Sequence, residues 1–186
     1  MLHDIELIEE INDNNIYIRK ISKDDTSFFY ESLKIKDITN YLSLGPLLSL
    51  DHAKRIIKNY LKYWDSYLQF NYIIELREES KPLKIGSVSL WNISWQHKRA
   101  EVGVWLIPNY WEKGIGKKTL MLIKTIAFVY LKLHRIQAHI AVENTRSIST
   151  FKKSGFIEEG KLKEYLNMNG KFYDAIVLAC FKKILM

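Results

Sequence analysis

The chain has 186 residues and a formal net charge of +7; 47% of its residues are hydrophobic and 26% are charged. This composition excludes a disordered chain, and the length predicts a single domain, residues 1–186, with a core of ordinary size. No apolar run is long enough to span a bilayer, and the acidic start MLHDIELIEE lacks the layout of a signal peptide. The only cysteine, Cys180, lies in the apolar run AIVLACF, so we expect a packed thiol and a cytoplasmic protein without membrane contact.

The basic residues and the histidines exclude two further classes of protein. No basic run is interleaved with stacking aromatic residues, so nucleic acid is not expected as the primary ligand. Attraction for an anionic ligand, or solubility alone, accounts for the positive charge. The five histidines, which lack the spacing of metal ligands, are His3, His52, His97, His134 and His139. We expect no metal site and interpret His134 and His139 as structural.

The N-terminal third is predicted to hold a strand and two helices. Apolar and polar residues alternate over residues 15–21, which predicts a strand, and residues 5–11 would pair with it across Asn12–Asn14. Ser22 or Asp24 is expected to cap a helix with the apolar positions Phe28, Phe29, Leu33 and Ile35. After Gly45-Pro46, Ser49 or Asp51 caps a second helix, whose continuous face is Ala53, Ile56, Ile57, Tyr60, Leu61 and Trp64.

The middle of the chain reads as strands followed by a helix. Alternation predicts strands over residues 70–76 and 83–91, with a turn at Arg77–Lys81 between them. A further strand from Glu101 ends at Pro108, which cannot donate to a sheet. The helix after it presents the apolar face Leu122, Ile123, Ile126, Ala127 and Tyr130.

The last third is predicted to contain a strand, a short helix and a hairpin. Apolar residues alternate over residues 136–142, and a helix beginning at Asn144 ends with Gly155 as its C′ glycine. Asn169-Gly170, the preferred pair for a two-residue turn, joins residues 164–168 to residues 171–181. The order β, α, α, β, β, β, α, β, α, β, β predicts one mixed α/β domain with a single helical crossover, between the fourth and fifth strands.

The loop before the third helix has the character of a phosphate cradle. It joins a strand to a helix start, where unpaired N–H groups and the helix dipole favour an anion, and its residues are Lys113, Gly114, Ile115, Gly116, Lys117 and Lys118. The two glycines allow close approach of the backbone, and the lysines add positive charge. Neither common nucleotide fingerprint matches, because Thr119 replaces the third glycine of GxGxxG and GxxxxGK[ST] is absent.

Four motifs in order resemble the GNAT superfamily of N-acetyltransferases, and within it the ribosomal-protein N-acetyltransferases of the RimJ/RimL kind. They are Glu101–Leu106, Trp111–Gly116, Val142–Ser147, and Lys153–Phe156 followed by Glu159-Gly160. The resemblance runs from the first strand to Asp174. It implies an α+β fold of six to seven strands, mostly antiparallel, and about four helices, in which the fourth and fifth strands splay apart.

The resemblance also implies acetyl-coenzyme A as the acetyl donor, with its pyrophosphate held by the Lys113–Lys118 loop. The pantetheine arm would lie between the splayed strands and bind the backbone of Trp105, Leu106 and Ile107. Asn144, an N-cap by its position, would also touch this arm. Phe151 would pack against the cofactor or the core.

Two residues depart from the wider family pattern. Trp111 stands where the glycine loop often opens with Gln or Arg. Phe151 stands where many relatives carry a tyrosine whose hydroxyl protonates the leaving thiolate, and a phenylalanine has no proton to give. This departure argues against a tyrosine acid and against a close match to the spermidine acetyltransferases, which share the Val142-Glu143-Asn144 segment.

Acyl transfer to an amine requires a base, a donor to the carbonyl oxygen and an acid for the thiolate. Glu101 is the candidate base, and its structural alternative is an ion pair with Arg99 or Lys98 or a solvated carboxylate. Glu164 is the second candidate. A backbone N–H near Leu106 would serve the oxyanion, and Ser147, one helical turn from Asn144, is the candidate acid unless it only satisfies local backbone groups.

We therefore predict an acetyl-CoA-dependent N-acetyltransferase, monomeric or homodimeric. It would act on a primary amine by direct attack in a ternary complex, and a protein N-terminal α-amine is the favoured acceptor. The alternatives are a small amine (polyamine, amino sugar or antibiotic) and a non-catalytic CoA-binding module. Four acidic residues could attract a cationic acceptor or form a solvated helix face: Asp24, Asp25, Glu31 and Asp37.

Overall fold

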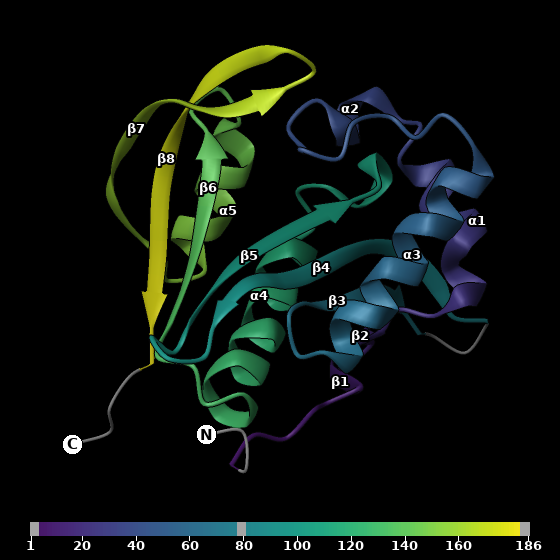
Figure 1. Ribbon diagram of the computed structural model, residues 1–186, viewed down its shortest axis with the longest axis horizontal. Coiled ribbons are helices and arrows are strands. Elements are labelled where there is room, and N and C mark those ends of the chain that lie inside the picture. Colours follow the sequence, from purple (N-terminus) through teal and green to yellow (C-terminus); the bar gives the residue numbers. More distant parts are fainter. Residues whose placement is uncertain (1–3, 78–80, 183–186) are drawn as a thin grey trace.

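The computed structural model describes residues 4–77 and 81–182. Eight strands form one sheet in the order β1-β2-β3-β4-β5-β6-β8-β7 (Figure 1). Their bounds are β1 Glu10–Asp13, β2 Ile16–Lys20, β3 Phe70–Leu76, β4 Leu83–Ser94, β5 Arg99–Leu106, β6 Arg135–Ala141, β7 Ile157–Met168 and β8 Lys171–Phe181. The neighbouring pairs are antiparallel except β5 and β6, which are parallel. The predicted mixed sheet and its helical crossover are confirmed, with one strand more than the upper estimate.

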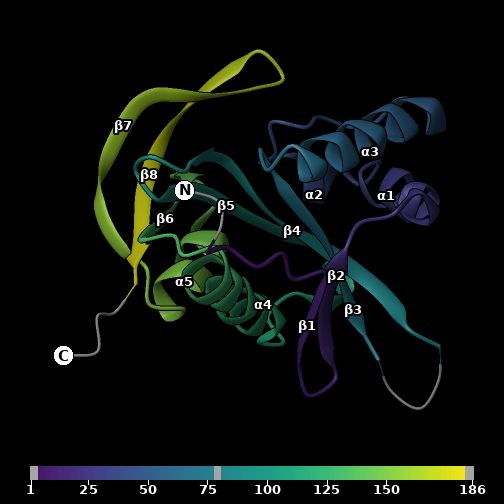
Figure 2. The same ribbon diagram turned by 60° about the horizontal axis from the view of Figure 1, so that its bottom comes forward.

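Five α-helices cover the two faces of the sheet: α1 Thr26–Ser32, α2 Lys36–Thr39, α3 Leu50–Asp65, α4 Ile115–Thr125 and α5 Thr145–Lys153. Helices α4 and α5 lie on one face, and α1 and α3 lie on the other (Figure 2). The neighbouring residues Ile73 and Ile74 point to opposite faces because side chains alternate along a strand. Ile74 packs in the core beneath α4, and Ile73 packs with Phe29 and Ile57 of α1 and α3.

The N-terminal hairpin is shorter than predicted. Strand β1 starts at Glu10 and pairs with β2, and the turn between them is at Asn14-Asn15, where Asn14 has φ of 53°. Glu10 and Ile11 pair with β2 as expected, but the expected turn at Asn12–Asn14 is wrong, and residues 5–9 lie outside the strand. Asparagine tolerates this left-handed conformation, so the four consecutive Asn and Asp residues at 12–15 left the turn position open.

The first predicted helix is split in the structure. Ser22 precedes a 3-10 turn, Lys23–Asp25, that leads into α1, and α1 ends at Ser32. Ile35 takes an extended conformation and is 36% exposed, so its expected place on the helix face is wrong. Helix α3 is confirmed, with Ser49 as its N-cap, since the Ser49 hydroxyl accepts from the His52 N–H at 3.1 Å.

Helix α4 continues into a π-helical turn, Ile126–Tyr130. A π turn adds a residue to the hydrogen-bonded ring and so rotates the side chains that follow. As a result Phe128 is buried along with Ile126 and Ala127, while Tyr130, expected on the buried face, is only half-buried.

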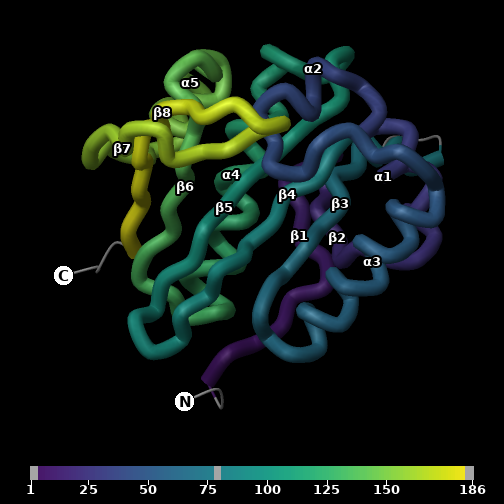
Figure 3. Tube along the Cα trace, turned by 45° about the horizontal axis from the view of Figure 1, so that its top comes forward, coloured from purple at the N-terminus to yellow at the C-terminus, as the bar shows by residue number. Residues whose placement is uncertain are grey.

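The C-terminal hairpin is longer than predicted and curls away from the sheet (Figure 3). Its turn at Asn169-Gly170 is confirmed, with φ of 54° and 83°, and Gly155 has the φ of 85° expected for a C′ glycine. Strand β7 begins at Ile157, earlier than the predicted start at Glu164. The prediction missed this part of the strand because the first nine residues of β7 are all exposed and carry no apolar alternation. The hairpin tip reaches the loop after α2, where the rings of Tyr173 and Tyr41 lie 6.5 Å apart.

Other expectations have mixed outcomes. Cys180 is buried on β8, as predicted. Most of the turn expected at Arg77–Lys81 lies outside the described residues. Within residues 4–77 and 81–182, no helix has the length and apolar character needed to cross a membrane.

Candidate active site

Strands β5 and β6 separate near their midpoints and form the walls of a cleft. They pair only where Arg99–Glu101 meets Arg135–Gln137, while β5 stays paired with β4 and β6 with β8. Beyond this junction the two strands diverge around a cleft of about 1120 Å³. The splayed pair implied by the resemblance is therefore present. The cleft is bounded by both splayed strands, by the N-terminal turns of α4 and α5, and by α2 and the β7–β8 hairpin.

The backbone of β5 offers polar groups to this cleft at alternate residues. The Ile107 N–H donates to the Ile85 carbonyl at 2.8 Å, so residue 107 faces β4. Because backbone groups alternate in direction along an antiparallel pair, Trp105 also faces β4, whereas Val104 and Leu106 face the gap. The Leu106 carbonyl accepts from the Trp111 Nε1–H at 2.7 Å. The resemblance implied that the backbone of Trp105, Leu106 and Ile107 binds the pantetheine arm. Since Trp105 and Ile107 face β4, we now predict this contact at Val104 and Leu106.

The loop before α4 leaves room for an anion. Gly114 has φ of 77°, and a Cβ placed on it would meet no atom within 4 Å. Lys118 makes the first helical hydrogen bond, to the Gly114 carbonyl at 3.2 Å, so the N–H groups of Ile115 to Lys117 precede the helical ladder. Gly114, Gly116 and Lys117 line the cleft, as does the carboxylate-bearing Glu112.

Arg146, which the sequence did not indicate, completes this end of the cleft. It lies in the first turn of α5, lines the cleft, and places its guanidinium 3.4 Å from the centre of the Trp111 ring. Trp111, the departure at the glycine loop, therefore links the end of β5 to the start of α5. Two helix N-termini and the cations of Lys117 and Arg146 line one opening, which fits a diphosphate. Lys113 lies in the same loop, with its Nζ 5.4 Å from the centre of the Tyr110 ring and outside the cleft lining.

The start of α5 presents a hydroxyl to the cleft. Asn144 is the N-cap, and its Oδ1 accepts from the Ser147 N–H at 3.2 Å. Because the cap uses only the backbone of Ser147, the hydroxyl of this residue is not committed to the cap, and Ser147 lines the cleft. Phe151 is 2% exposed and packs edge-on against Phe156 with 4.9 Å between ring centres, so it belongs mainly to the core.

Glu101 lies beside the cleft and not on its wall. Its carboxylate accepts from Asn92 Nδ2 at 2.8 Å and lies 3.3 Å from His139 Nδ1. These contacts replace the expected alternative of an ion pair with Arg99 or Lys98. The hydrogen bond from His139 lowers the pKa of the Glu101 carboxyl, burial opposes this shift, and Asn92 adds to it.

A second, smaller pocket of about 190 Å³ lies behind this carboxylate. Its walls include Asn92, Arg99, Glu101, Gln137, His139 and Tyr165, and His139 is the residue that also lines the main cleft. The second candidate base, Glu164, is exposed and has its backbone N–H on Asp174 Oδ1 at 2.9 Å. It does not line either pocket among the described residues.

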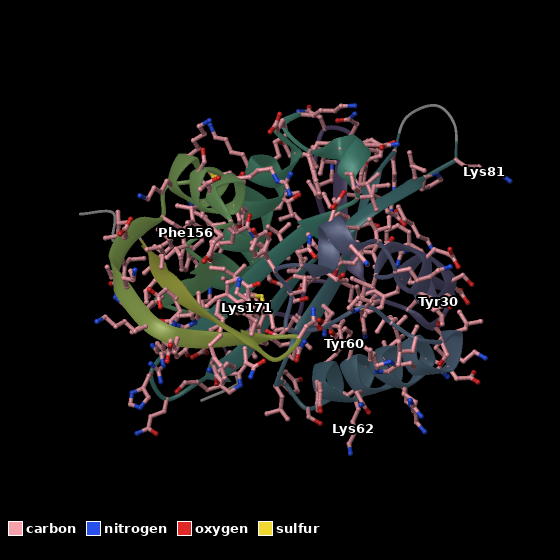
Figure 4. The ribbon with its side chains drawn as sticks, turned by 90° about the horizontal axis from the view of Figure 1, so that it is seen from above. Tyr30, Tyr60, Lys62, Lys81, Phe156 and Lys171 are labelled. Carbon is pink, nitrogen blue, oxygen red and sulfur yellow. The ribbon has the colours of Figure 1, made fainter. Side chains whose placement is uncertain are left out.

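The acceptor end of the cleft is largely apolar. Aromatic and aliphatic residues there come from α1, the segment around α2, α3 and the hairpin, and they include Phe29, Tyr41, Leu42, Tyr60, Leu166 and Met168. The hairpin tip, marked by Lys171, reaches over the cleft toward Tyr60 (Figure 4).

Only one of the four acidic residues singled out in the sequence, Asp37, lines this end. Asp25 is fully buried and pairs with Arg19 and Lys84, while Glu31 pairs with Lys34 on the surface. Across the described part of the chain, which leaves out His3, no cluster of side chains has the make-up of a metal site.

Comparison with known proteins places this geometry in a family. A model of the acetyltransferase (GNAT) domain matches residues 15–157. The chain is 27% identical over 169 residues to the N-acetyltransferase YoaA of Bacillus subtilis, covering 91% of this chain and 94% of that protein. It is 26% identical over 161 residues to a spermidine N(1)-acetyltransferase of Vibrio cholerae, covering 87% and 90%. A close match to the spermidine acetyltransferases was not expected, because Phe151 replaces the tyrosine that many relatives carry.

Solved structures agree with the fold. The Vibrio cholerae spermidine N-acetyltransferase, in complex with CoA and spermine, superposes with a TM-score of 0.80 at 25% identity, covering 91% of this chain and 97% of that one. RimL, a ribosomal L7/L12 alpha-N-protein acetyltransferase in complex with coenzyme A, gives 0.85 at 18% identity, covering 93% and 98%. The cleft, its cationic end and these matches lead to one conclusion: the chain belongs to the GNAT family of acetyltransferases and is an acetyl-CoA-dependent N-acetyltransferase.

Proposed function

We propose that this enzyme acetylates the α-amine of a protein N-terminus, by direct attack of the amine in a ternary complex with acetyl-CoA. The observation that carries this proposal is the chemistry of the acceptor end, which is apolar and supplies one carboxylate, Asp37. A peptide N-terminus has one cation followed by a chain with apolar parts, and it matches such a surface in both respects.

A polyamine matches this surface less well. It carries several cations along a flexible chain, and each needs its own carboxylate or water when it leaves bulk solvent. Asp25 is committed to its ion pairs, and Glu31 pairs with Lys34. The other carboxylate on the cleft wall, Glu112, lies at the anion-binding end.

The reactivity of the amine favours the same acceptor. An α-amine with a pKa of about 7.7–8.0 is partly neutral at physiological pH, whereas a lysine-type amine near 10.4 is almost wholly charged. An N-terminal acceptor therefore needs only modest help in losing its proton.

Each end of the cleft has a role in this proposal. Acetyl-CoA supplies an acetyl group activated as a thioester. Its diphosphate would be held by the N–H groups at the start of α4, by Lys113 and Lys117, and by Arg146, and its arm by the backbone near Val104 and Leu106. Asn144 fixes the first turn of α5, from which the Ser147 hydroxyl is placed to donate a proton to the leaving sulfur. Glu101, beside the cleft, is the carboxylate that would assist removal of the proton from the amine.

Acetylation of a small amine is the second candidate, and one observation favours it. The spermidine N(1)-acetyltransferase of Vibrio cholerae is similar to this chain, and the similarity covers 87% of this chain. Asp37 would then hold the distal cation of the small amine.

A panel of acceptors separates the two candidates. Peptides with Ala, Ser or Met at a free N-terminus, the same peptides blocked at the α-amine, and spermidine would be compared by thiol release and by mass spectrometry of the products. We expect kcat/KM for the best free peptide to exceed that for spermidine at least tenfold, with no acetylation of the blocked peptides. Preference for spermidine would overturn the proposal.

A further inference from the structure

His139 occupies a position on β6 that joins the two pockets. It comes two residues after Gln137, the last β6 residue paired with β5, and so lies where the strands begin to diverge. Its side chain is 9% exposed and contributes to both the main cleft and the small polar pocket behind Glu101. In the described part of the chain, no other residue lines both.

The contacts of His139 fix one ring nitrogen. Nδ1 lies 3.3 Å from Glu101 Oε2, and the other carboxylate oxygen, Oε1, is held by Asn92 Nδ2 at 2.8 Å. The Tyr165 ring, 4.7 Å away between centres, covers the imidazole. No hydrogen bond joins Nε2 to any of the described residues. A carboxylate on one nitrogen selects the tautomer whose other nitrogen accepts a proton.

We propose that His139 is the general base of the reaction and that Glu101 is its positioning residue. This inference rests on the proposed function, since it concerns how an acceptor amine loses its proton in the cleft. His139 Nε2 takes the proton, and Glu101 orients the ring through Nδ1–H and balances the charge of the imidazolium that forms.

The protons balance in this scheme. An ammonium acceptor has three N–H protons: one stays on the amide, one ends on the leaving thiol, and one is released to solvent. The N–H bond broken at the amine is replaced by an N–H bond at His139 Nε2, which then passes its proton to water. Neither an oxidant nor a further reactant is needed.

The charges around His139 are consistent with this role. On β5 it faces Glu101, with Arg99 in the same small pocket, on β7 it faces Tyr165, and its partner on β8 is the apolar Val177. The lowered pKa of Glu101 keeps its carboxylate ionised at neutral pH, so the negative charge behind the ring persists through the working range. A half-buried carboxylate that already accepts two hydrogen bonds is itself a poor proton acceptor.

The test compares His139→Ala and His139→Gln with the wild type across pH, using the best acceptor found for the wild type. We expect kcat/KM at pH 7 to fall about 100-fold in both variants, the size typical of a lost general base. The loss should shrink as pH rises toward 9, because the α-amine then loses its proton unaided. Affinity for acetyl-CoA, measured by calorimetry, should be unchanged.

Chemical rescue distinguishes a base from a structural residue. Removing the His139 side chain opens space next to both pockets, so added imidazole should restore activity to His139→Ala and leave the wild type unaffected. His134→Gln, at an exposed position just before β6, is the matched control and should behave as wild type. Glu101→Gln should lower kcat about tenfold and leave the KM values for both substrates unchanged, because the amide no longer orients the ring or balances the charge of the imidazolium.

Failure of the inference looks different from failure of the proposed function. If the wild type acetylates peptides and both His139 variants keep its rate and pH profile, His139 is not the base. If His139→Ala does not fold, the pH profile of His139→Gln decides alone. A wild type that acetylates no peptide but does acetylate another amine overturns only the choice of acceptor, and the same variants then test His139 with that amine.

Discussion

The guanidinium of Arg146 lies 3.4 Å from the centre of the Trp111 ring, and this stack joins the first turn of α5 to the loop that precedes α4. Trp111 is held in turn by its Nε1–H bond to the Leu106 carbonyl at 2.7 Å. A planar cation over an indole ring keeps its N–H donors directed outward while losing little conformational freedom. The stack therefore prepares a donor for the anion-binding end of the cleft.

Arg146→Ala should weaken acetyl-CoA binding about tenfold, which is ~1.4 kcal/mol, and the effect should diminish at high salt. Arg146→Lys keeps the charge but not the planar stack, so it should recover only part of the affinity. Calorimetry at two salt concentrations measures both effects. Arg55→Ala, at an exposed site on α3, is the control. Equal affinities for Arg146→Ala and wild type would remove Arg146 from the binding site.

Ser147→Ala and Asn144→Ala should separate catalysis from folding. The cap bond uses the Ser147 N–H, so loss of the hydroxyl should leave the melting temperature nearly unchanged and lower kcat about 10- to 100-fold. Asn144→Ala removes the cap and should cost about 1 kcal/mol of stability. Thermal melts and initial rates on the same preparations check both. A Ser147→Ala enzyme with wild-type kcat would show that the thiolate needs no acid from this position.

Asp37→Asn should affect the acceptor and not the donor. The side chain is exposed at the acceptor end, and exposed ion pairs contribute less than about 1 kcal/mol, so KM for the peptide should rise about three- to fivefold. KM for acetyl-CoA should stay constant. Asp65→Asn, on the exposed end of α3, serves as the charge-matched comparison. A larger penalty with spermidine than with peptide would favour the polyamine as acceptor.

Acid stability should depend on Asp25. Burial raises the pKa of its carboxyl, but hydrogen bonds from Arg19, Lys84 and the Ser22 N–H outweigh burial and lower the pKa to about 2. A group whose pKa is lowered by folding stabilises the protein above its ordinary value of 3.8, and this contribution is lost as pH falls toward 2.

Asp25→Ala should therefore cost about 3–5 kcal/mol near pH 7, because it removes a fully buried carboxylate from the half-buried cations Arg19 and Lys84. Urea unfolding of both proteins at pH 7, 4 and 2.5 measures the difference, which should shrink at the lowest pH. A difference that is independent of pH would mean that packing, not charge, explains the cost.

Local signals in the sequence were enough to predict much of the fold. The Asn169-Gly170 turn, the C′ Gly155 and the amphipathic α3 each depend on residues close together in the chain, and all three are confirmed. The extent of β7 and the π turn after α4 were missed. An exposed strand has no hydrophobic period, and a π turn shifts a helical period without any marker residue.

The candidate site, too, was predictable only where its residues lie close together in the chain. The Gly114 loop and the Asn144 cap follow from local geometry, and the structure places both at the cleft. His139 and Arg146 could not be assigned in this way, because their roles depend on Glu101 and Trp111, which are 38 and 35 residues away in the chain. An isolated histidine in a strand reads as structural until its partner across the sheet is known.

The contact between the β7–β8 hairpin and the loop after α2 has a geometric consequence. The ring of Tyr173 contacts that of Tyr41, and a Cβ at Gly45 would lie 2.9 Å from Asn169 Oδ1. The hairpin, which begins beside β6, therefore crosses the cleft and contacts the segment after α2 on its other side. We therefore expect an amine at the end of an extended chain to enter beneath the hairpin more readily than the same amine on the surface of a folded domain.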